Sequence, residues 1–354
     1  MKIVIFMPSL KAGGAQRVII NIINKLVEEK YKVLLVLICY KGDLFDTLPN
    51  NLDLKLLNKN RVRDGIFECY KILREYKPDL VFSSLAHVNL ILLFLSKFLP
   101  THIKFIVREA NTPSIIIKNR ILKILYRYLY NSADKIIAQS ELIKNELIEL
   151  FHIKKNIIAR INNPVDIKLI RKNINRLNRL DENKKFLISA GRLVHQKGLD
   201  ILINILSKFD DDFYLIILGE GPDYKHLTEI VKNLNIEKKI FFYGYVKNPW
   251  ELIASADIFL LPSRWEGTPN AALEALACGT KIIASPNSGG LIDLKESVKK
   301  NDIIITNFDD NFIYKLRENT KLLKNEILSS KLPKEYYSEN VTSTYINLFR
   351  EIVE

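Results

Sequence analysis

The feature that most constrains the fold is an alternation of short β-branched segments with amphipathic helical segments along the whole chain. The apolar segments are continuous, which predicts parallel strands buried on both faces and joined by crossover helices. A first series of strands is expected at residues 2–7, 33–38, 79–84, 104–107, 135–138 and 157–161. A second series is expected at residues 185–191, 213–219, 240–244, 257–263, 281–285 and 302–306. The chain is therefore predicted to form two Rossmann-like, doubly wound α/β domains.

The boundary between these domains is predicted at "NNPVD" (residues 162–166), because Pro164 keeps Asn163 out of the helical region and the neighbouring residues favour a turn. The predicted domains are residues 1–165 and 166–338. Residues 339–354 are expected to form a last amphipathic helix that can pack back on either half, the first domain included. With 354 residues, of which 48% are hydrophobic, the chain can fill two medium cores.

The cysteines indicate a reduced, cytosolic setting, and the longest apolar run is too short to cross a membrane. Cys39, Cys69 and Cys278 are widely spaced and form neither a CxxC nor a metal-ligand pattern. No basic and then apolar leader precedes the first strand, so no targeting segment is expected. Residues 90–99 are about half as long as a membrane span and contain Lys97, so they are expected to form a buried helix.

Positive charge is concentrated in the first half of the chain. Residues 1–165 hold 26 Lys and Arg against 14 Asp and Glu, whereas the remainder holds 27 against 26. This asymmetry indicates that the first half meets a polyanion, either nucleic acid or an anionic membrane surface. A generally basic proteome would explain the sign of the charge but not its uneven distribution. No RNA- or DNA-binding module is recognisable, so nucleic acid is the weaker candidate.

Residues 114–132 combine basic side chains with Ile, Leu and Tyr, a composition typical of a helix that rests on anionic lipid. The basic residues are Lys118, Arg120, Lys123 and Arg127. A core helix with a solvated basic stripe would have the same composition and stays open as the alternative.

Two strand-to-helix loops have the composition of phosphate sites. Gly13 and Gly14 follow the first strand and let backbone N–H groups at a helix start approach an anion. The loop is not GxGxxG and no acidic residue ends the second strand, so a dinucleotide cofactor is disfavoured. Arg192 and Lys197 flank the matching loop of the second half, where a guanidinium and an ammonium can neutralise a diphosphate. A tight turn in the first half and an exposed basic loop in the second remain the alternatives.

The segment "SRWEGTPNAALEALACGT" (residues 263–280) places two glutamates, Glu266 and Glu274, around a predicted helix start. Thr268 is expected to be the N-cap and Pro269 the first helical residue. Glu266 then lies in the loop before the helix and Glu274 in its second turn, so both carboxylates can border one cleft at the carboxyl ends of the strands. Carboxylates that accept hydrogen bonds from hydroxyls, next to a positive cradle, fit a nucleotide sugar.

Several short motifs occur in the order found in a known enzyme family. They are "GGAQR", "NNPVD", "GRLVHQKG", "GEGP", "EGTPNAALEALACGT" and "SGG", and they span nearly the whole chain. With the E-x7-E pair of Glu266 and Glu274, the sequence resembles the retaining GT-B glycosyltransferases of group 1, also called family four. The resemblance implies two Rossmann-like domains that face a central cleft. Residues 1–165 would bind the acceptor and residues 166–338 the nucleotide sugar.

The resemblance also implies a role for each residue of the donor site. Arg192 and Lys197 look like ligands of the diphosphate, Glu266 would hold hydroxyls of the donor sugar, and Glu274 would hold the ribose. The other implied substrate-binding positions are Gly13 and Gly14 at the distal phosphate, Val246 at the base, and Thr268, Pro269 and Asn270 beside the donor sugar.

One part of the site departs from the family pattern. Many relatives carry a histidine after the strand that matches residues 104–113, facing the donor sugar, whereas this chain has Arg-Glu-Ala-Asn at residues 108–111. Glu109 and Asn111 are the polar candidates for a catalytic group there. The catalytic set implied by the resemblance and this substitution is Glu266, Lys197, Arg192, Glu109 and Asn111.

No metal ion or other cofactor is expected. The "DDD" at residues 210–212 contains the metal-binding DxD pattern of another glycosyltransferase fold, but it precedes a strand and is expected to be a solvated turn. Arg192 and Lys197 would supply the positive charge that a departing diphosphate needs. His87 and His195 are expected to be surface or loop residues.

The resulting hypothesis is a retaining glycosyltransferase that moves a sugar from a nucleotide diphosphate, with UDP as the expected nucleotide, to a lipid-linked or cell-surface glycan. The basic first half favours a polyprenyl-diphosphate-linked acceptor, reached by a cytoplasmic protein at the inner face of the membrane. A sugar-nucleotide 2-epimerase of the same fold is one alternative. A non-catalytic protein that binds sugar nucleotides or nucleic acid is the other.

Overall fold

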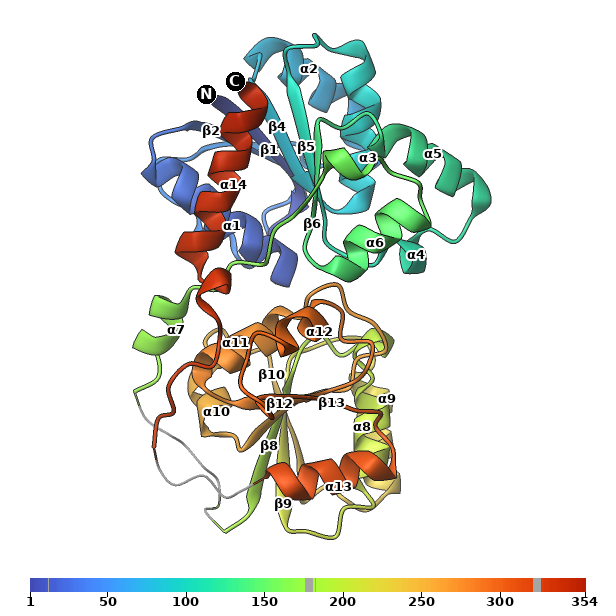
Figure 1. The fold of residues 1–354 in the computed structure, drawn as a ribbon, viewed down its shortest axis with the longest axis vertical. Helices are drawn as coiled ribbons and strands as arrows, with labels where there is room; N and C mark the ends of the chain where they lie inside the picture. Colours follow the sequence, from blue (N-terminus) through green and yellow to red (C-terminus); the bar gives the residue numbers. More distant parts are fainter. Residues whose placement is uncertain (12, 176–180, 182, 321–325) are drawn as a thin grey trace. The chain divides into compact units, whose positions relative to one another are not determined.

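The computed structural model describes residues 1–11, 13–175, 181, 183–320 and 326–354. These residues form two compact units, Met1–Pro164 with Ser338–Glu354 and Val165–Tyr337 (Figure 1). Val165 donates its backbone N–H to the carbonyl oxygen of Tyr336 at 2.9 Å. The two chain segments that connect the units are therefore hydrogen-bonded to each other.

The first unit is built on a parallel sheet whose described strands lie in the order β3-β2-β1-β4-β5-β6-β7. They are β1 (Lys2–Ser9), β2 (Lys32–Tyr40), β3 (Asp53–Leu56), β4 (Leu80–Ser84), β5 (Lys104–Glu109), β6 (Lys135–Ala138) and β7 (Ile158–Arg160). β1 pairs with both β2 and β4, so the crossovers run in opposite directions from this strand, as in a doubly wound sheet. The helices are α1 (Gly14–Glu28), α2 (Ile66–Tyr76), α3 (Ala86–Leu95), α4 (Pro113–Ile116), α5 (Arg120–Tyr130), α6 (Glu141–Glu149) and α14 (Ser338–Val353).

Both faces of this sheet are covered by helices, as its continuous apolar strands predict. Side chains alternate between the two faces of a strand. Val4 and Phe6 of β1 accordingly pack in the core under α2, α3, α5 and α6, whereas Ile3 and Ile5 pack in the core under α1 and α14. All four side chains are 0% exposed. A strand of this kind has no polar face, which is why its sequence shows no alternation.

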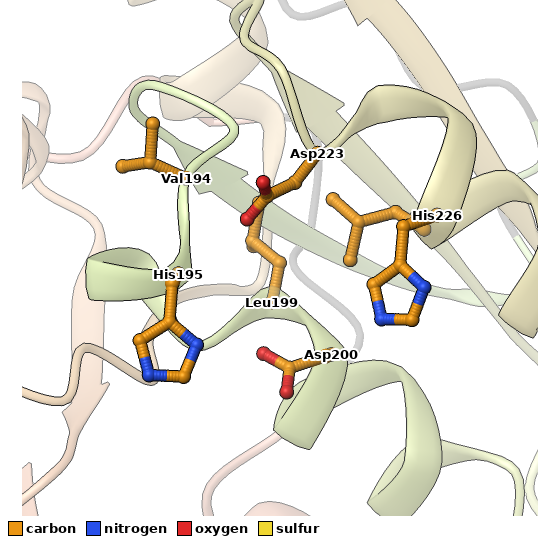
Figure 2. Close-up of a pocket in the computed structure, with 7 residues that line it drawn as sticks. Val194, His195, Leu199, Asp200, Asp223 and His226 are labelled. Atoms are coloured by element: carbon orange, nitrogen blue, oxygen red, sulfur yellow. The ribbon is translucent and has the colours of Figure 1, made fainter.

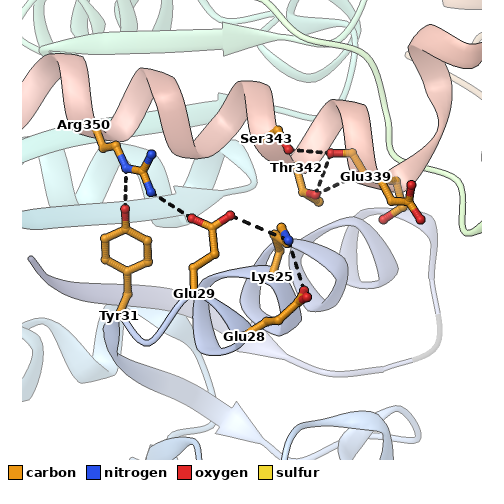
Figure 3. Close-up of polar contacts among 9 residues, drawn as sticks. Lys25, Glu28, Glu29, Tyr31, Glu339, Thr342, Ser343 and Arg350 are labelled. Atoms are coloured by element: carbon orange, nitrogen blue, oxygen red, sulfur yellow. Dashed lines mark hydrogen bonds and ion pairs between the residues drawn. The ribbon is translucent and has the colours of Figure 1, made fainter.

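The C-terminal helix α14 lies beside α1 on one face of the first sheet (Figure 1). Phe349 is fully buried, and its ring centroid lies 5.2 Å from that of Phe82 on β4. At the surface, Arg350 donates to the Tyr31 hydroxyl at 2.5 Å and to the Glu29 carboxylate at 2.9 Å (Figure 3). Apolar packing thus fixes the inner side of α14, and a polar cluster lies along its outer edge.

The second unit repeats the architecture with described strands in the order β10-β9-β8-β11-β12-β13. They are β8 (Lys185–Ala190), β9 (Phe213–Leu218), β10 (Ile240–Gly244), β11 (Ile258–Leu261), β12 (Lys281–Ala284) and β13 (Ile303–Ile305). Phe186 and Ile188 of β8 enter one core and Leu187 enters the other, so this sheet is also buried on both faces. The helices are α7 (Ile167–Lys172), α8 (Leu199–Leu206), α9 (Tyr224–Asn233), α10 (Trp250–Ser255), α11 (Asn270–Cys278), α12 (Gly290–Lys295) and α13 (Asp310–Asn319).

The prediction of two Rossmann-like, doubly wound parallel sheets is confirmed. The edge strand β3 was not predicted, because its residues are exposed or only partly buried and lack a continuous apolar run. The prediction of one buried helix over residues 90–99 is wrong at its end, since α3 stops at Leu95 and Phe98 is 60% exposed. Among the described residues, no helix combines the length and the hydropathy that crossing a bilayer would require.

Residues 114–132 form two helices instead of one. α4 ends at Ile116, and α5 begins after Asn119, whose side chain accepts a hydrogen bond from the backbone N–H of Ile121 at 2.8 Å. This N-cap satisfies a helix donor that would otherwise lack a partner. The basic segment therefore presents α5 as a separate, capped helix.

Replacing Phe349 with Ala is expected to destabilise the first unit by about 3–5 kcal/mol, because a fully buried ring is lost and a cavity remains. Replacing Arg350 with Ala should have a far smaller effect, since its ion pair lies at the surface. Denaturant titrations followed by circular dichroism measure both changes. Equal effects of the two substitutions would contradict the conclusion that apolar packing holds α14.

Candidate functional site

The loop after β8 brings Lys197 to the carboxyl end of the second sheet. A Cβ atom at Gly191 would lie 3.2 Å from Lys197 Cε, so the missing side chain leaves room for the lysine stem. Gly198, the next residue after the short 3₁₀ turn His195–Lys197, has a left-handed φ of 63°, and a Cβ there would lie 2.2 Å from the Pro262 carbonyl oxygen. Glycine is required at this position because the loop packs directly on the backbone that follows β11.

Lys197 meets Glu266, which lies in the loop after β11. The ammonium donates to Glu266 Oε1 at 2.5 Å, and the hydroxyl of Ser263 donates to the same oxygen at 2.7 Å. The side chains of Lys197 and Glu266 are only 19% and 7% exposed. β8 and β11 are hydrogen-bonded neighbours, so two residues separated by 69 positions meet as a half-buried ion pair.

The segment after Glu266 differs in detail from its prediction. Helix α11 begins at Asn270, and Pro269 occupies the cap position with extended backbone. Thr268 was expected to be the N-cap and Pro269 the first helical residue, and both predictions are wrong by one position. Thr268 is buried, and Asn270 is half-buried at the helix start. The polar groups of this turn therefore remain next to Glu266.

A close backbone contact supports the Glu266 loop from the side of β12. Gly290 donates its N–H to the Gly267 carbonyl oxygen at 2.7 Å. A Cβ at Gly289 would lie 2.4 Å from the Glu266 carbonyl oxygen. The "SGG" motif thus permits the loops after β11 and β12 to touch.

Glu274 lies in the second turn of α11 and is half-buried. Its Oε2 accepts a hydrogen bond from Nε1 of Trp250 at 2.9 Å. Trp250 begins α10 and is 4% exposed. The indole therefore orients the carboxylate, and this partner was missed because no local pattern links the two positions in sequence.

Arg192 shares the loop after β8 with Lys197, whereas Val246 lies on another loop of the same unit. Arg192 follows β8 and its side chain is exposed, with no ion pair to any of the residues that the structure describes. Val246 follows β10, is half-buried, and packs against one of the two cores. Both lie after the carboxyl ends of strands, as Lys197 and Glu266 do.

A second ion pair joins the loops around Lys197. Arg264 donates two hydrogen bonds to the carboxylate of Asp200, at 2.8 and 2.6 Å, and this contact lowers the pKa of Asp200. The same guanidinium donates to the His195 carbonyl oxygen at 2.8 Å. The loop after β8 is therefore fixed to the loop after β11, a constraint that the sequence motifs did not reveal.

A small pocket lies beside this second ion pair (Figure 2). It is lined by Val194, His195, Leu199, Asp200, Asp223, His226 and Leu227. Its volume of about 40 Å³ is far below the range of about 300–1,000 Å³ that ligand pockets of drug size occupy. Within the described part of the chain, no group of three His, Cys, Asp or Glu side chains is placed to hold a metal ion. The pocket lies between the loop after β8 and the first turns of α8 and α9.

The "DDD" segment at residues 210–212 lies between α8 and β9, at the opposite end of the strands from Lys197. Asp211 pairs with Lys185 and lies 3.6 Å from the Arg317 guanidinium. These contacts fit an ion-paired surface turn before the strand. His87 on α3 and His195 are both exposed.

In the first unit, Gly13 and Gly14 stand at the start of α1. Gly14 is its first helical residue, and Gly13 precedes it with extended backbone. Ala12, which precedes this pair, lies outside the described residues. The 15-residue helix directs free backbone N–H groups and the positive end of its dipole toward this turn.

Glu109 and Asn111 have very different surroundings although they are two residues apart. Glu109 ends β5 and is 0% exposed, and its Oε2 accepts hydrogen bonds from the hydroxyls of Tyr126 and Tyr130 at 2.8 and 2.7 Å. Asn111 is exposed in the loop that follows. The structure therefore does not bring the two candidate groups to a common surface.

Models of two known families match the chain. One, described as Glycosyltransferase Family 4, matches residues 12–169, and the other, described as Glycosyl transferases group 1, matches residues 170–337. An uncharacterised glycosyltransferase of Haemophilus influenzae is 32% identical over 297 residues, which cover 81% of each chain. The N-acetylgalactosamine-N,N'-diacetylbacillosaminyl-diphospho-undecaprenol 4-alpha-N-acetylgalactosaminyltransferase of Campylobacter jejuni is 27% identical over 306 residues, or 83% of each chain.

Solved structures share the fold over almost the whole chain. Anabaena HepE, solved with UDP and glucose, superimposes with a TM-score of 0.81 at 18% identity, covering 99% of this chain and 100% of HepE. The apo lipopolysaccharide outer core galactosyltransferase WaaB gives a TM-score of 0.73 at 21% identity, covering 99% of this chain and 100% of WaaB. The chain therefore belongs to the group 1 glycosyltransferases, also called family four, and has their GT-B fold.

Proposed function

We propose that this glycosyltransferase moves a sugar, with retention of anomeric configuration, from a UDP-sugar to a polyprenyl-diphosphate-linked glycan. The observation that carries the proposal is the half-buried pair of Lys197 and Glu266, with Glu274 on the helix that follows. A cation for a diphosphate and carboxylates for sugar and ribose hydroxyls are what a nucleotide sugar requires. Val165–Tyr337 is accordingly the proposed donor-binding unit, and the other unit is the proposed acceptor-binding unit.

Each donor-site residue has a proposed part in the reaction. Lys197 and the exposed Arg192 bind the diphosphate and stabilise its charge as it leaves. When a diphosphate binds, it accepts hydrogen bonds from the Lys197 ammonium. Glu266 Oε1 can then accept a hydrogen bond from the sugar. Glu274 accepts from the ribose. The remaining proposed contacts are Gly13 and Gly14 to a phosphate, Val246 to the base, and Thr268, Pro269 and Asn270 to the sugar.

Retention implies transfer on the face from which the diphosphate departs. The bond between the anomeric carbon and the diphosphate oxygen breaks, and the acceptor oxygen forms the new bond on the same face. The acceptor proton passes to an oxygen of the departing diphosphate, so no protein base is needed. Arg192 and Lys197 supply the positive charge, and exposed Asn111 is the proposed polar group on the acceptor side.

The acceptor class is supported by two relatives and by the charge of the first unit. The name of the Campylobacter enzyme describes transfer to an undecaprenol-diphosphate-linked sugar, and WaaB acts on a lipopolysaccharide core. HepE has been solved with UDP and glucose, which supports UDP as the nucleotide. A lipid-linked acceptor would be met by a cytoplasmic protein at the inner face of the membrane.

Helix α5 is the proposed membrane contact. Its apolar side chains Ile121, Ile124 and Tyr128 are 75%, 70% and 66% exposed. Such a group of exposed large apolar side chains is unusual on a surface that faces water. The basic residues among and beside them are Lys118, Arg120, Lys123 and Arg127. Apolar groups flanked by cations match the boundary between acyl chains and anionic headgroups.

A donor panel tests the proposed reaction directly. UDP- and GDP-sugars are incubated with and without short polyprenyl-diphosphate saccharides, and products are analysed by mass spectrometry and by the anomeric coupling in NMR spectra. We expect product only with a UDP-sugar and an acceptor, with the anomeric configuration of the donor. A new sugar nucleotide formed without acceptor would instead identify an epimerase, and no product with any donor would favour a binding protein.

Substitutions at the donor site separate binding from transfer. Glu274→Gln should raise the donor KM about tenfold with little change in kcat, because a charge-assisted hydrogen bond to the ribose is weakened. Lys197→Ala should lower kcat about a hundredfold, because the departing diphosphate loses a cation. Steady-state kinetics with the accepted donor measure both values.

Lys185→Ala is the matched control for Lys197→Ala. The Lys185 side chain is 18% exposed and ion-paired, but it lies at the amino end of β8. It should leave kcat unchanged. If both lysine variants lower kcat equally, Lys197 has no special part in transfer.

Neutralising α5 is expected to release the protein from anionic vesicles. Each basic residue contributes about 1 kcal/mol at such a surface, so a variant with Gln in place of Lys118, Arg120, Lys123 and Arg127 should bind about a thousandfold more weakly. Binding of the unaltered protein should also weaken with added salt. Sedimentation with phosphatidylglycerol vesicles measures both effects.

A control of equal charge comes from exposed lysines of the second unit, namely Lys225, Lys232, Lys238 and Lys300. Their replacement by Gln changes the net charge by the same amount and should leave vesicle binding nearly unaltered. Equal losses in the two quadruple variants would mean that total charge, and not α5, determines binding.

A further inference from the structure

Glu109 is a buried acidic residue to which the proposed transfer assigns no chemical step. It is the last residue of β5, and its side chain has no contact with solvent. Both hydrogen bonds to its Oε2 come from α5, namely from the hydroxyls of Tyr126 and Tyr130. The two tyrosine rings are stacked with centroids 3.7 Å apart. A carboxylate in this place cannot touch a sugar, but it binds the helix that carries the proposed membrane contact.

The donors and acceptors around Glu109 form a continuous chain across four elements. Ser83 of β4 donates to Asn89 Oδ1 at 2.7 Å, and Asn89 Nδ2 donates to the hydroxyl oxygen of Tyr130 at 3.0 Å. The Tyr130 hydroxyl oxygen therefore accepts from Asn89 while its proton points to Glu109. This arrangement leaves the phenol only one direction in which to donate, so the position of α5 is fixed relative to β4, α3 and β5.

Helix α5 buries a narrow set of side chains in the first unit. The buried residues of this helix are Tyr126, Leu129 and Tyr130, and two of these three are the tyrosines that bind Glu109. Most of its other apolar side chains are exposed, Ile121 and Ile124 by at least 70%. Because two of the three buried side chains also donate to Glu109, the packing of α5 and its polar contact depend on the same two tyrosines.

The protonation of the two tyrosines fits their role as hydrogen-bond donors to Glu109. Burial raises the pKa of Glu109, and the hydrogen bonds from Tyr130 and Tyr126 act in the opposite direction. The pKa values of both tyrosines lie well above their usual value, again because of burial, so both phenols keep the protons that they donate.

We propose that Glu109 is a positioning residue that acts through Tyr126 and Tyr130 to hold α5 in the orientation that engages the lipid-linked acceptor. The inference rests on the proposed function of α5 and deepens it. It differs from the expectation that Glu109 acts on the sugar, since that role requires an exposed carboxylate. On this view a neutral acceptor of the two phenol hydrogen bonds replaces the carboxylate adequately, whereas loss of the phenol hydroxyls does not.

The test compares Glu109→Gln with the double variant Tyr126→Phe/Tyr130→Phe. The Gln side chain keeps an oxygen for both phenols and gives up the long 3.5 Å contact of the other oxygen with the Asn111 backbone N–H, so the acceptor KM and kcat should stay within about threefold of the unaltered enzyme. The double Phe variant keeps the carboxylate and the stacked rings but removes both donors. Its acceptor KM should rise about tenfold, because α5 spends less time in the bound orientation, while the donor KM stays unchanged. The opposite pattern, with kcat lost in Glu109→Gln and an unaltered double Phe variant, would overturn the proposal.

Hydrogen exchange measured by mass spectrometry tests how firmly α5 is held, without an activity assay. Amides of residues 120–130 should exchange faster in the double Phe variant, while those of α6 stay protected. Unchanged exchange in α5 would overturn the anchoring role of Glu109 and leave the proposed function intact. Faster exchange in α5 with an unaltered acceptor KM would support the anchoring role of Glu109. The same result would contradict the proposal that α5 engages the lipid-linked acceptor.

A matched variant controls for a general loss of stability. Ser140 is the N-cap of α6, where it accepts from the Ile143 N–H at 3.3 Å, and Ser140→Ala should destabilise the same unit without touching α5. Its acceptor KM should not change. If the double Phe variant fails to fold, the single variants Tyr126→Phe and Tyr130→Phe are measured in the same way, and each should show a smaller rise in acceptor KM. A rise of the same size in Ser140→Ala would overturn the proposal.

Discussion

Burial of both faces of each parallel sheet is the constraint on which the rest of the structure depends. A strand with two apolar faces must be covered by a helix on each side, so the chain leaves every strand at the same edge and crosses over a helix layer. The loops that follow the strands therefore collect at one edge, whatever their separation in sequence. In the second unit this brings Lys197, after β8, to Glu266, after β11, across 69 positions. The site follows from the topology before any specific chemistry is considered.

The electrostatics of that edge explain how a buried carboxylate is stabilised there. A lone carboxylate that is only 7% exposed would be costly, but Glu266 is compensated by the Lys197 ammonium and the Ser263 hydroxyl. The bidentate contact between Arg264 and Asp200 fixes the same two loops from outside. The backbone that presents Lys197 is thus held by contacts that do not involve the ammonium itself, which keeps the proposed anion-binding group preorganised.

The sequence predicted those features that depend on local pattern. Continuous apolar runs revealed the buried strands, and the spacing of Glu266 and Glu274 placed one in a loop and the other on a helix. Features that depend on distant partners were not predictable. Trp250 binds Glu274 from another helix, and no pattern in the chain links the two. The exposed edge strand β3 has no apolar run, and the interruption before α5 depends on a single asparagine cap.

Arg108 and Glu109 at the end of β5 show that residue type alone does not identify a catalytic group. Both side chains are 0% exposed, yet neighbours on a strand point to opposite faces of the sheet. Arg108 donates to Ser84, Gln139 and Asn163, and so it holds the segment that leads to the chain crossing at Pro164. Glu109 turns to the other face and binds the tyrosines of α5. The family resemblance of the sequence implied that a group near this strand end faces the sugar. In the structure the two charged side chains at the strand end instead make two separate structural contacts. Asn111, two residues after Glu109, is exposed, and for this reason the proposed polar group on the acceptor side is a loop residue and not a strand residue.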